Sequence, residues 1–290
     1  IILVMTNLVK LSVTLSLIFS INNVYADREA FESTYVPLAP EKIVIQNASI
    51  YDGDGGEFFE TDVLVEDGKI IAIGKDLPFS NEFRVIDATG KWVTPGIIDI
   101  HSHMGVYPAP GVRTSSDGNE ATSPVTADVW AEHSIWVQDP QYALALTGGV
   151  TAFHILPGSA NLIGGRGVTV KNLQRVTINS MKFPDAPHSL KMACGENPKR
   201  VYGNRGQAPS TRMGNAAGYR KSWIQAEGYL RRLNEYEEKS DEAKELEYAP
   251  TRDLEMETLA GVLKGEILVH NHCYRACLLY TSDAADEEAS

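Results

Sequence analysis

Short β-branched runs separated by turn residues characterise the chain up to about residue 95. One apolar run at residues 63–65 is followed by another at 70–73, and the dipeptide Asp67-Gly68 lies between them. Two β-branched runs joined by Asp-Gly are typical of a hairpin. Similar short runs continue toward residue 95, so the sequence predicts a small β-sandwich domain over residues 27–95.

Strands and helices alternate after residue 95. Residues 96–100 form a continuous apolar run, which is typical of a parallel strand buried on both faces. The alternation predicts parallel βα units, and therefore an α/β domain over residues 96–276. Further expected elements are a helix over residues 142–146, strands over 150–153, 168–170, 189–193 and 267–269, and helices over much of 219–248 and around 254–263.

The two ends of the chain differ in pattern from the rest. Lys10 precedes an apolar stretch over residues 11–21, which together have the parts of a secretory signal peptide over residues 1–26. The stretch is shorter than the ~20 residues that span a bilayer, so we expect cleavage, no stable membrane anchor, and export to the periplasm or beyond the cell. Residues 277–290 resemble a translated sequencing adapter, and we expect them to be foreign to the fold.

Composition excludes several classes of protein. The formal net charge is -12, which argues against nucleic acid as a partner, because phosphate binding needs clustered cations. Only three cysteines are present, too few for a disulfide framework. Cys194 and Cys273 each follow a predicted strand, and a disulfide between them and two free thiols both remain open.

Two histidines end the strand predicted at residues 96–100. His101 and His103 are two residues apart, so their side chains share one face of the strand. They lie just beyond its carboxyl end, where the active sites of βα barrels are built. Imidazole nitrogens at such a position indicate a site for Zn²⁺ or a similar ion.

The sequence around these histidines resembles a known enzyme family. Residues 93–103, V-T-P-G-I-I-D-I-H-S-H, resemble the barrel entry of the metal-dependent amidohydrolase superfamily, and residues 156–161, L-P-G-S-A-N, resemble its imidazolonepropionase-like branch. The resemblance implies a partial (β/α)8 TIM-type barrel with an N-terminal β-sandwich. It also implies one or two divalent ions, expected to be zinc, that activate water against an amide-like bond.

The resemblance assigns metal ligands residue by residue. His101 and His103 match the ligands of the first strand. Lys191 matches the bridging ligand of the fourth strand, which the family carries as a carboxylated lysine, and Glu196 is the alternative bridge. Carboxylation would turn the cation into an anionic oxygen ligand.

A second pair of histidines follows the last predicted strand. His270 matches the ligand of the fifth strand, while His272 lies two residues further on and shares its face, so their order stays open. We expect His272 to be a site or supporting residue. His154 ends the strand at residues 150–153 and either faces the pocket or is a hydrogen-bonded structural residue.

Two loops near the predicted site complete the candidates. Tyr107 lies in the loop after the metal histidines, where loop residues over a barrel mouth often contact substrate. The glycine-rich segment 164–167 lacks a directly following helix, so we interpret it as a turn or substrate loop rather than a phosphate cradle.

The predicted function is that of the intact parent protein. No segment after His270 supplies the eighth-strand Asp that the resemblance implies as proton acceptor, so we assign no catalytic residue and expect this fragment to be inactive. We predict a metal-dependent hydrolase of carbon–nitrogen bonds in a small peptide or cyclic amide. A deaminase of nitrogen heterocycles and a non-catalytic barrel scaffold are the alternatives, and a homo-oligomer is a further expectation.

Overall fold

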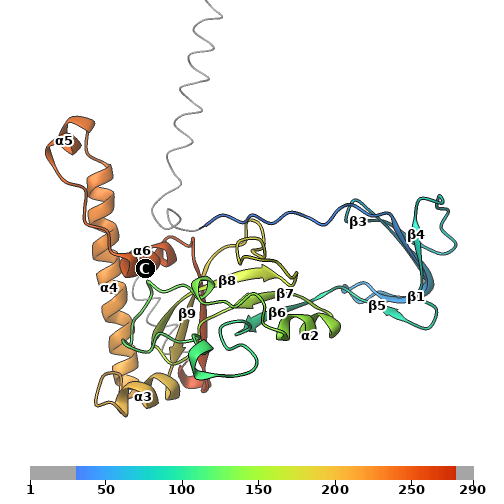
Figure 1. Cartoon of the computed structure of the whole chain (residues 1–290). Coiled ribbons are helices and arrows are strands. Elements are labelled where there is room, and N and C mark those ends of the chain that lie inside the picture. The colour runs from blue at the N-terminus through green and yellow to red at the C-terminus, as the bar shows by residue number, and fades with distance from the viewer. Residues whose placement is uncertain (1–30, 279–290) are drawn as a thin grey trace, which may run out of the picture.

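The computed structural model describes residues 31–278, which contain two five-stranded sheets (Figure 1). The expected signal peptide and nearly all of the expected foreign tail lie outside the described residues. The exceptions are Cys277 and Leu278, and Leu278 is buried in the larger hydrophobic core. Between residues 31 and 278, no helix combines the length and the apolar character that a bilayer span requires.

The first sheet contains the predicted hairpin. Asp67 and Gly68 connect its two antiparallel strands with φ angles of 51° and 72°, the positive values that such a two-residue turn requires. The strand order is β3-β2-β1-β4, and β5 pairs with β1. The described residues form one sheet here, so the sandwich stays a prediction. The strands are β1 (Ile43–Tyr51), β2 (Glu57–Glu66), β3 (Lys69–Gly74), β4 (Arg84–Asp87) and β5 (Trp92–Val93).

The second sheet has the order β10-β9-β8-β7-β6 and curls as part of a barrel would (Figure 1). The expectation of parallel units is only partly correct. The outer pairs β6–β7 and β9–β10 are parallel, whereas β8 runs antiparallel to both of its neighbours. These strands are β6 (Ile97–Ser102), β7 (Val150–Ile155), β8 (Ile163–Lys171), β9 (Ser189–Cys194) and β10 (Leu268–Cys273).

The glycine-rich segment 164–167 belongs to strand β8, so its interpretation as a turn or substrate loop was wrong. The physical reason lies in a close approach of the backbone. A Cβ atom at Gly165 would lie 2.4 Å from the carbonyl oxygen of Val129, and Gly165 has a φ of +109°. Glycines are needed here to let a neighbouring chain segment pack against the strand.

The edge strands are more exposed than the sequence predicts. Ile98 and Ile100 of β6 are 61% and 68% exposed, although their apolar run was expected to be buried on both faces. Leu268 of β10, also expected in a buried strand, is 51% exposed. Both strands form edges of the sheet, and within residues 31–278 nothing covers these apolar side chains.

Helices α3, α4 and α6 lie on the side of the second sheet away from the first sheet, whereas α2 lies beside β7 (Figure 1). The long helix α4 contacts α6, and the larger core joins them to β9 through buried residues that include Leu190, Trp223 and Leu259. The predicted helices were therefore correct in their positions. They are α2 (Gln141–Thr147), α4 (Arg212–Glu237), α5 (Asp241–Leu246) and α6 (Leu254–Leu263), whereas α3 (Glu196–Gly203) was not predicted.

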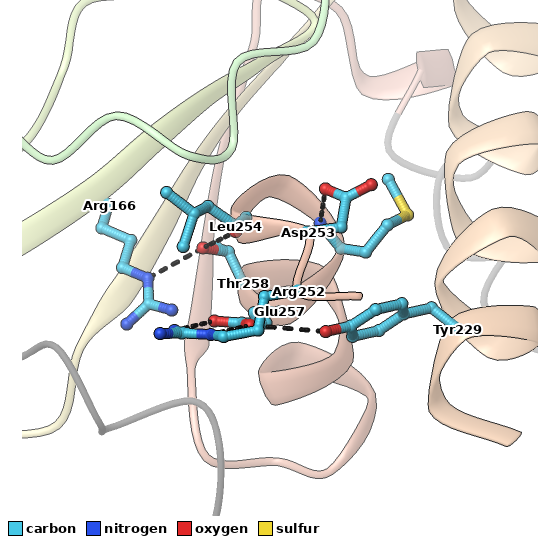
Figure 2. A network of polar contacts seen from close by, with 8 residues as sticks. Arg166, Tyr229, Arg252, Asp253, Leu254, Glu257 and Thr258 are labelled. Atoms are coloured by element: carbon cyan, nitrogen blue, oxygen red, sulfur yellow. Dashed lines mark hydrogen bonds and ion pairs between the residues drawn. The ribbon is translucent and has the colours of Figure 1, made fainter. Parts of the chain in front are cut away.

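Polar contacts fasten α6 between α4 and β8 (Figure 2). Arg252 forms two hydrogen bonds of 2.7 and 2.6 Å with the buried carboxylate of Glu257, which also accepts one from the Tyr229 hydroxyl at 3.3 Å. On the other side, Arg166 of β8 donates to Thr258 at 2.9 Å. A buried carboxylate satisfied in this way holds the helix in one position against the sheet.

Candidate functional site

His101 and His103 lie at the carboxyl end of β6 with their ring centroids 5.3 Å apart. The Nδ1 atom of His103 is 2.8 Å from the carbonyl oxygen of Leu156. A carbonyl can only accept, so Nδ1 carries the proton and Nε2 keeps its lone pair. A backbone carbonyl that orients the ring in this way is the usual support of a metal-binding histidine.

Lys191 reaches the first histidine from the opposite part of the curled sheet. It is 1% exposed, and every residue of its strand β9 is buried. Its Nζ atom lies 2.8 Å from Nε2 of His101. Burial lowers the pKa of the Lys191 amine to about 8. The structure thus brings Lys191 and His101 together, and their role as metal ligands stays a prediction.

His270 and His272 approach Lys191 from the neighbouring strand. β10 is parallel to β9, with His270 opposite Lys191 and His272 opposite Ala193. The Nε2 atom of His272 is buried and has no hydrogen-bond partner among the described residues. A buried imidazole nitrogen without a partner is costly unless something binds it. This observation keeps His272 beside His270 as a candidate ligand.

The four histidines are held in the neutral form. Burial is the main cause that lowers the pKa of His101, His103, His270 and His272, and the nearby Lys191 cation lowers each further. For His101, the other three imidazoles also contribute, because all of them lie close by. Neutral imidazole is the form that ligates a metal ion.

Two predicted site residues have other partners. The carboxylate of Glu196 forms an ion pair with Arg275 at 2.7 Å, so the alternative bridge is engaged outside the histidine group. His154 uses both ring nitrogens, toward Thr169 at 2.9 Å and Ser189 at 2.6 Å. Burial lowers the pKa of His154 to about 4. These bonds fit the structural interpretation of His154, which also stacks on the ring of His270.

The donor set fits a divalent ion in its chemistry. Three features support it: the oriented lone pair of His103, the contact of His101 with Lys191, and the buried Nε2 of His272. Within the described residues, no three His, Cys, Asp or Glu side chains are already arranged around one point. The set therefore needs Lys191, whose ammonium form would repel a cation and whose carboxylated form would attract one.

Sequence reasoning missed the residue that fixes the loop after His103. Asp139 is fully buried, and its carboxylate accepts hydrogen bonds from the backbone N–H of Gly105 at 3.1 Å and of Gln141 at 3.0 Å. It thus ties the loop to the start of helix α2. The only signal in the sequence is an Asp followed by Pro140 directly before a predicted helix, a common pattern at helix starts.

The structure contains the disulfide between Cys194 and Cys273, which the sequence had left open. Cys194 and Cys273 are opposite each other at the ends of β9 and β10, with their Cα atoms 5.1 Å apart. The bond joins the strand of Lys191 to the strand of His270 and His272. Cys273 directly follows His272, and Cys194 is two residues after Met192. The bond therefore lies close to the predicted site.

The chain is similar to several known proteins. No protein-family model matches it. The amidohydrolase tasK of Hapsidospora irregularis is 37% identical over 240 residues, which cover 77% of this chain and 24% of that protein. A dihydroorotase of Lactobacillus helveticus is 46% identical over 74 residues, covering 26% of this chain and 16% of that protein.

A solved structure is similar over most of the fold. The crystal structure of an amidohydrolase from Thermotoga maritima MSB8 superimposes with a TM-score of 0.77 at 38% identity. The match covers 86% of this chain and 62% of that one. The chain thus spans less than two thirds of the length of each of these relatives.

Proposed function

We propose that this relative of the amidohydrolases is, as a full-length protein, a metal-dependent hydrolase of carbon–nitrogen bonds other than esters. Its similarity to proteins named amidohydrolase and dihydroorotase supports hydrolysis of an amide-type bond. We infer a small peptide or a cyclic amide as the substrate. The imidazolonepropionase-like branch, suggested by residues 156–161, is part of this proposal.

One observation carries the proposal. The buried Lys191 amine meets Nε2 of His101 at 2.8 Å, while His270 lies opposite Lys191 on the next strand. A fully buried lysine with a lowered pKa destabilises the folded protein if its role is purely structural, because its ammonium form has lost its hydration. Its Nζ contacts an imidazole, a group that binds metals.

His101, His103, Lys191 in carboxylated form, and His270 would hold one or two divalent ions, with zinc as the first candidate. A bound ion of this kind lowers the pKa of water from 15.7 to about 7 and polarises a carbonyl group. His272 would serve as an alternative ligand or bind the substrate. Among residues 31–278 we assign no proton acceptor for the attacking water.

The chain's own residues prepare the site for this chemistry. The Leu156 carbonyl fixes the ring of His103, and Asp139 fixes the loop that follows it. Burial keeps the histidines neutral at neutral pH. These groups are thus positioned before any ligand arrives, which lowers the cost of organising the site on binding.

Three further proposals concern the whole protein. The N-terminal sequence supports export through a cleaved signal peptide. Bound partners would be a small molecule or short peptide rather than nucleic acid, consistent with the net charge of -12. We also propose that the protein forms a homo-oligomer, and we assign no surface to that contact.

Metal analysis and a substrate screen of the full-length protein test the proposed function. We expect about one or two zinc, manganese or iron ions per chain, and loss of activity with a chelator. A panel of dipeptides, lactams and aminated heterocycles separates the alternatives: released amine from dipeptides or opened lactams supports the proposal, whereas ammonia from the heterocycles alone would indicate a deaminase. A protein without metal, whose stability is unaffected by chelator, would be a scaffold.

A further inference from the structure

We propose that the Tyr107 hydroxyl donates a hydrogen bond to the carbonyl oxygen of the substrate as that oxygen gains negative charge. This assignment rests on the proposed amide hydrolysis and extends it to a residue outside the metal ligands. Tyr107 lies four residues after His103, and the two ring centroids are 5.8 Å apart. Its side chain is 40% exposed, so a substrate at the histidines can reach it.

The backbone of Tyr107 is fixed on both sides. Its N–H donates to the carbonyl of His103 at 3.1 Å, and its own carbonyl accepts from the Gln141 side chain at 3.1 Å. Gln141 also donates to the buried carboxylate of Asp139, which holds the N–H of Gly105. The loop that carries Tyr107 is therefore anchored to helix α2 and keeps the ring beside His103.

The direction of two hydrogen bonds determines where the hydroxyl proton can point. The backbone N–H of Ala160 can only donate, and it donates to Oδ1 of Asn119 at 2.8 Å. Nδ2 of Asn119 must then be the donor in its 2.6 Å contact with the Tyr107 oxygen. The tyrosine oxygen is the acceptor of that bond. Its own proton has no acceptor among residues 31–278 and remains available to a ligand.

Two glycines make room for this arrangement. A Cβ atom at Gly118 would lie 2.2 Å from Cζ of Tyr107, and one at Gly158 would lie 2.0 Å from Nδ2 of Asn119. Gly158 belongs to the L-P-G-S-A-N segment after β7. Larger residues at either position would displace the tyrosine–asparagine pair, so the pair occupies a cradle formed by two separate loops.

A cavity of about 560 Å³ adjoins the pair on the side of Asn119. Gly118, Asn119 and Pro157 are among the residues that line it, whereas Tyr107 and the four histidines of the candidate site are not. Pro157 follows Leu156, the residue whose carbonyl orients His103. The cavity is therefore a neighbouring space for parts of a substrate beyond the bond that is cleaved.

The step assigned to Tyr107 leaves its own proton in place. Oxygen of the attacking water forms a bond to the carbonyl carbon, and the C=O π pair moves onto the carbonyl oxygen. When that pair re-forms C=O, the C–N bond breaks and the nitrogen takes the water's proton. Burial raises the pKa of Tyr107, so it stays a donor throughout neutral pH. Donors placed where charge develops stabilise the transition state.

Replacement Tyr107→Phe in the full-length, zinc-loaded protein is the first test, with Tyr248→Phe on the exposed chain as the matched control. We expect kcat to fall on the order of 10²–10³-fold while KM changes by less than about threefold. Binding of a phosphinate dipeptide mimic, measured by calorimetry, should weaken by about 10²-fold. The control should change neither quantity, and both variants should melt like the wild type.

Replacement Asn119→Asp tests the direction of the hydrogen bonds. An aspartate keeps the bond to Ala160 but accepts the Tyr107 proton instead of donating. We expect a loss of kcat similar to that of Tyr107→Phe, and no further loss when both substitutions are combined. A merely structural role of Asn119 would give additive losses.

The outcomes separate this assignment from the proposed function. Wild-type hydrolysis with a Tyr107→Phe kcat within about threefold of normal would overturn the role of Tyr107 alone. A loss confined to KM would do the same, because it would indicate uniform binding of the substrate. A wild-type protein that hydrolyses no amide would overturn the proposed function itself.

Discussion

The inner and outer strands of the second sheet differ sharply in packing. All six residues of β9 are buried, and β8 is nearly as well covered. β6 and β10 are the edges, where Ile100 is 68% and Leu268 51% exposed. The histidines of the candidate site belong to these edges, whereas Lys191 belongs to the buried centre.

The buried inner strands and the exposed edge strands have different roles in the candidate site. The buried strands set the position of Lys191 through dense packing, which tolerates little change. The edge strands supply the imidazoles, and three links hold them to the centre: the Lys191–His101 contact, the His103–Leu156 hydrogen bond and the Cys194–Cys273 disulfide. The site thus depends on a few specific links between strands of unequal burial.

Replacement Lys191→Ala should have the largest effect. It removes the buried amine that contacts Nε2 of His101, so we expect loss of bound metal and a fall in activity of at least about 10³-fold. Elemental analysis and rates of the full-length protein measure the two effects. Lys199→Ala, on α3, is the matched control and should change neither. Full metal content in Lys191→Ala would refute a ligand role.

More of the candidate site than of the packing around it could be predicted from the sequence. The H-x-H motif at a strand end, with the family resemblance that singled out Lys191, led us to expect His101 and Lys191 at one site, and the structure places them in contact although they lie 90 residues apart in sequence. The helices and the Asp67-Gly68 hairpin also followed from local patterns. Local patterns determine where an element forms, because hydrogen bonds and side-chain spacing within a few residues decide it.

Three features could not be predicted from local patterns. The antiparallel direction of β8, the exposure of β6 and the Cys194–Cys273 bond all depend on which strands become neighbours. A continuous apolar run in β6 indicates that it can be buried, but residues 31–278 do not supply its cover. Asp139 was missed for the same reason, since two of its partners, the N–H groups of Gly105 and Ala109, lie 34 and 30 residues away.

Shortening a side chain should lower the free energy of unfolding more in the buried strands than in the edge strands. Ile155 of β7 is fully buried, so Ile155→Ala should lower the free energy of unfolding by about 2–5 kcal/mol. Ile100→Ala, on the exposed face of β6, should cost less than about 1 kcal/mol. Denaturant titration measures both. Equal losses would mean that more of the protein packs onto β6 than residues 31–278 provide.

Loss of the disulfide should weaken the link between edge and centre. Cys194 and Cys273 close a segment with a sequence separation of 79, for which loss of the bond costs about 2–4 kcal/mol. We expect Cys273→Ser, or reduction of the wild type, to lower the melting temperature and metal affinity together. Cys277→Ser, outside the disulfide, serves as the control. Unchanged melting in Cys273→Ser would show that strand pairing alone holds β10.

The smallest expected effect is a pH dependence on the helix that supports the buried centre. Burial, Asp128 and Asp253 raise the pKa of Glu255, in the first turn of α6, from 4.5 to about 7. The folded state therefore binds more protons than the unfolded state between these values, and stability falls as the pH rises from about 4.5 to 7. Because Glu255 is only partly buried, we expect about 1–2 kcal/mol after solvent screening.

Replacement Glu255→Gln should remove this loss. The variant should gain stability relative to the wild type at pH 8 and match it near pH 4, because a neutral amide resembles the protonated carboxyl. Unfolding titrations at both pH values measure the difference, and Glu245→Gln on the exposed helix α5 is the control. A pH slope that persists in Glu255→Gln would move its origin to other groups, and the support of the buried centre would then not depend on this carboxyl.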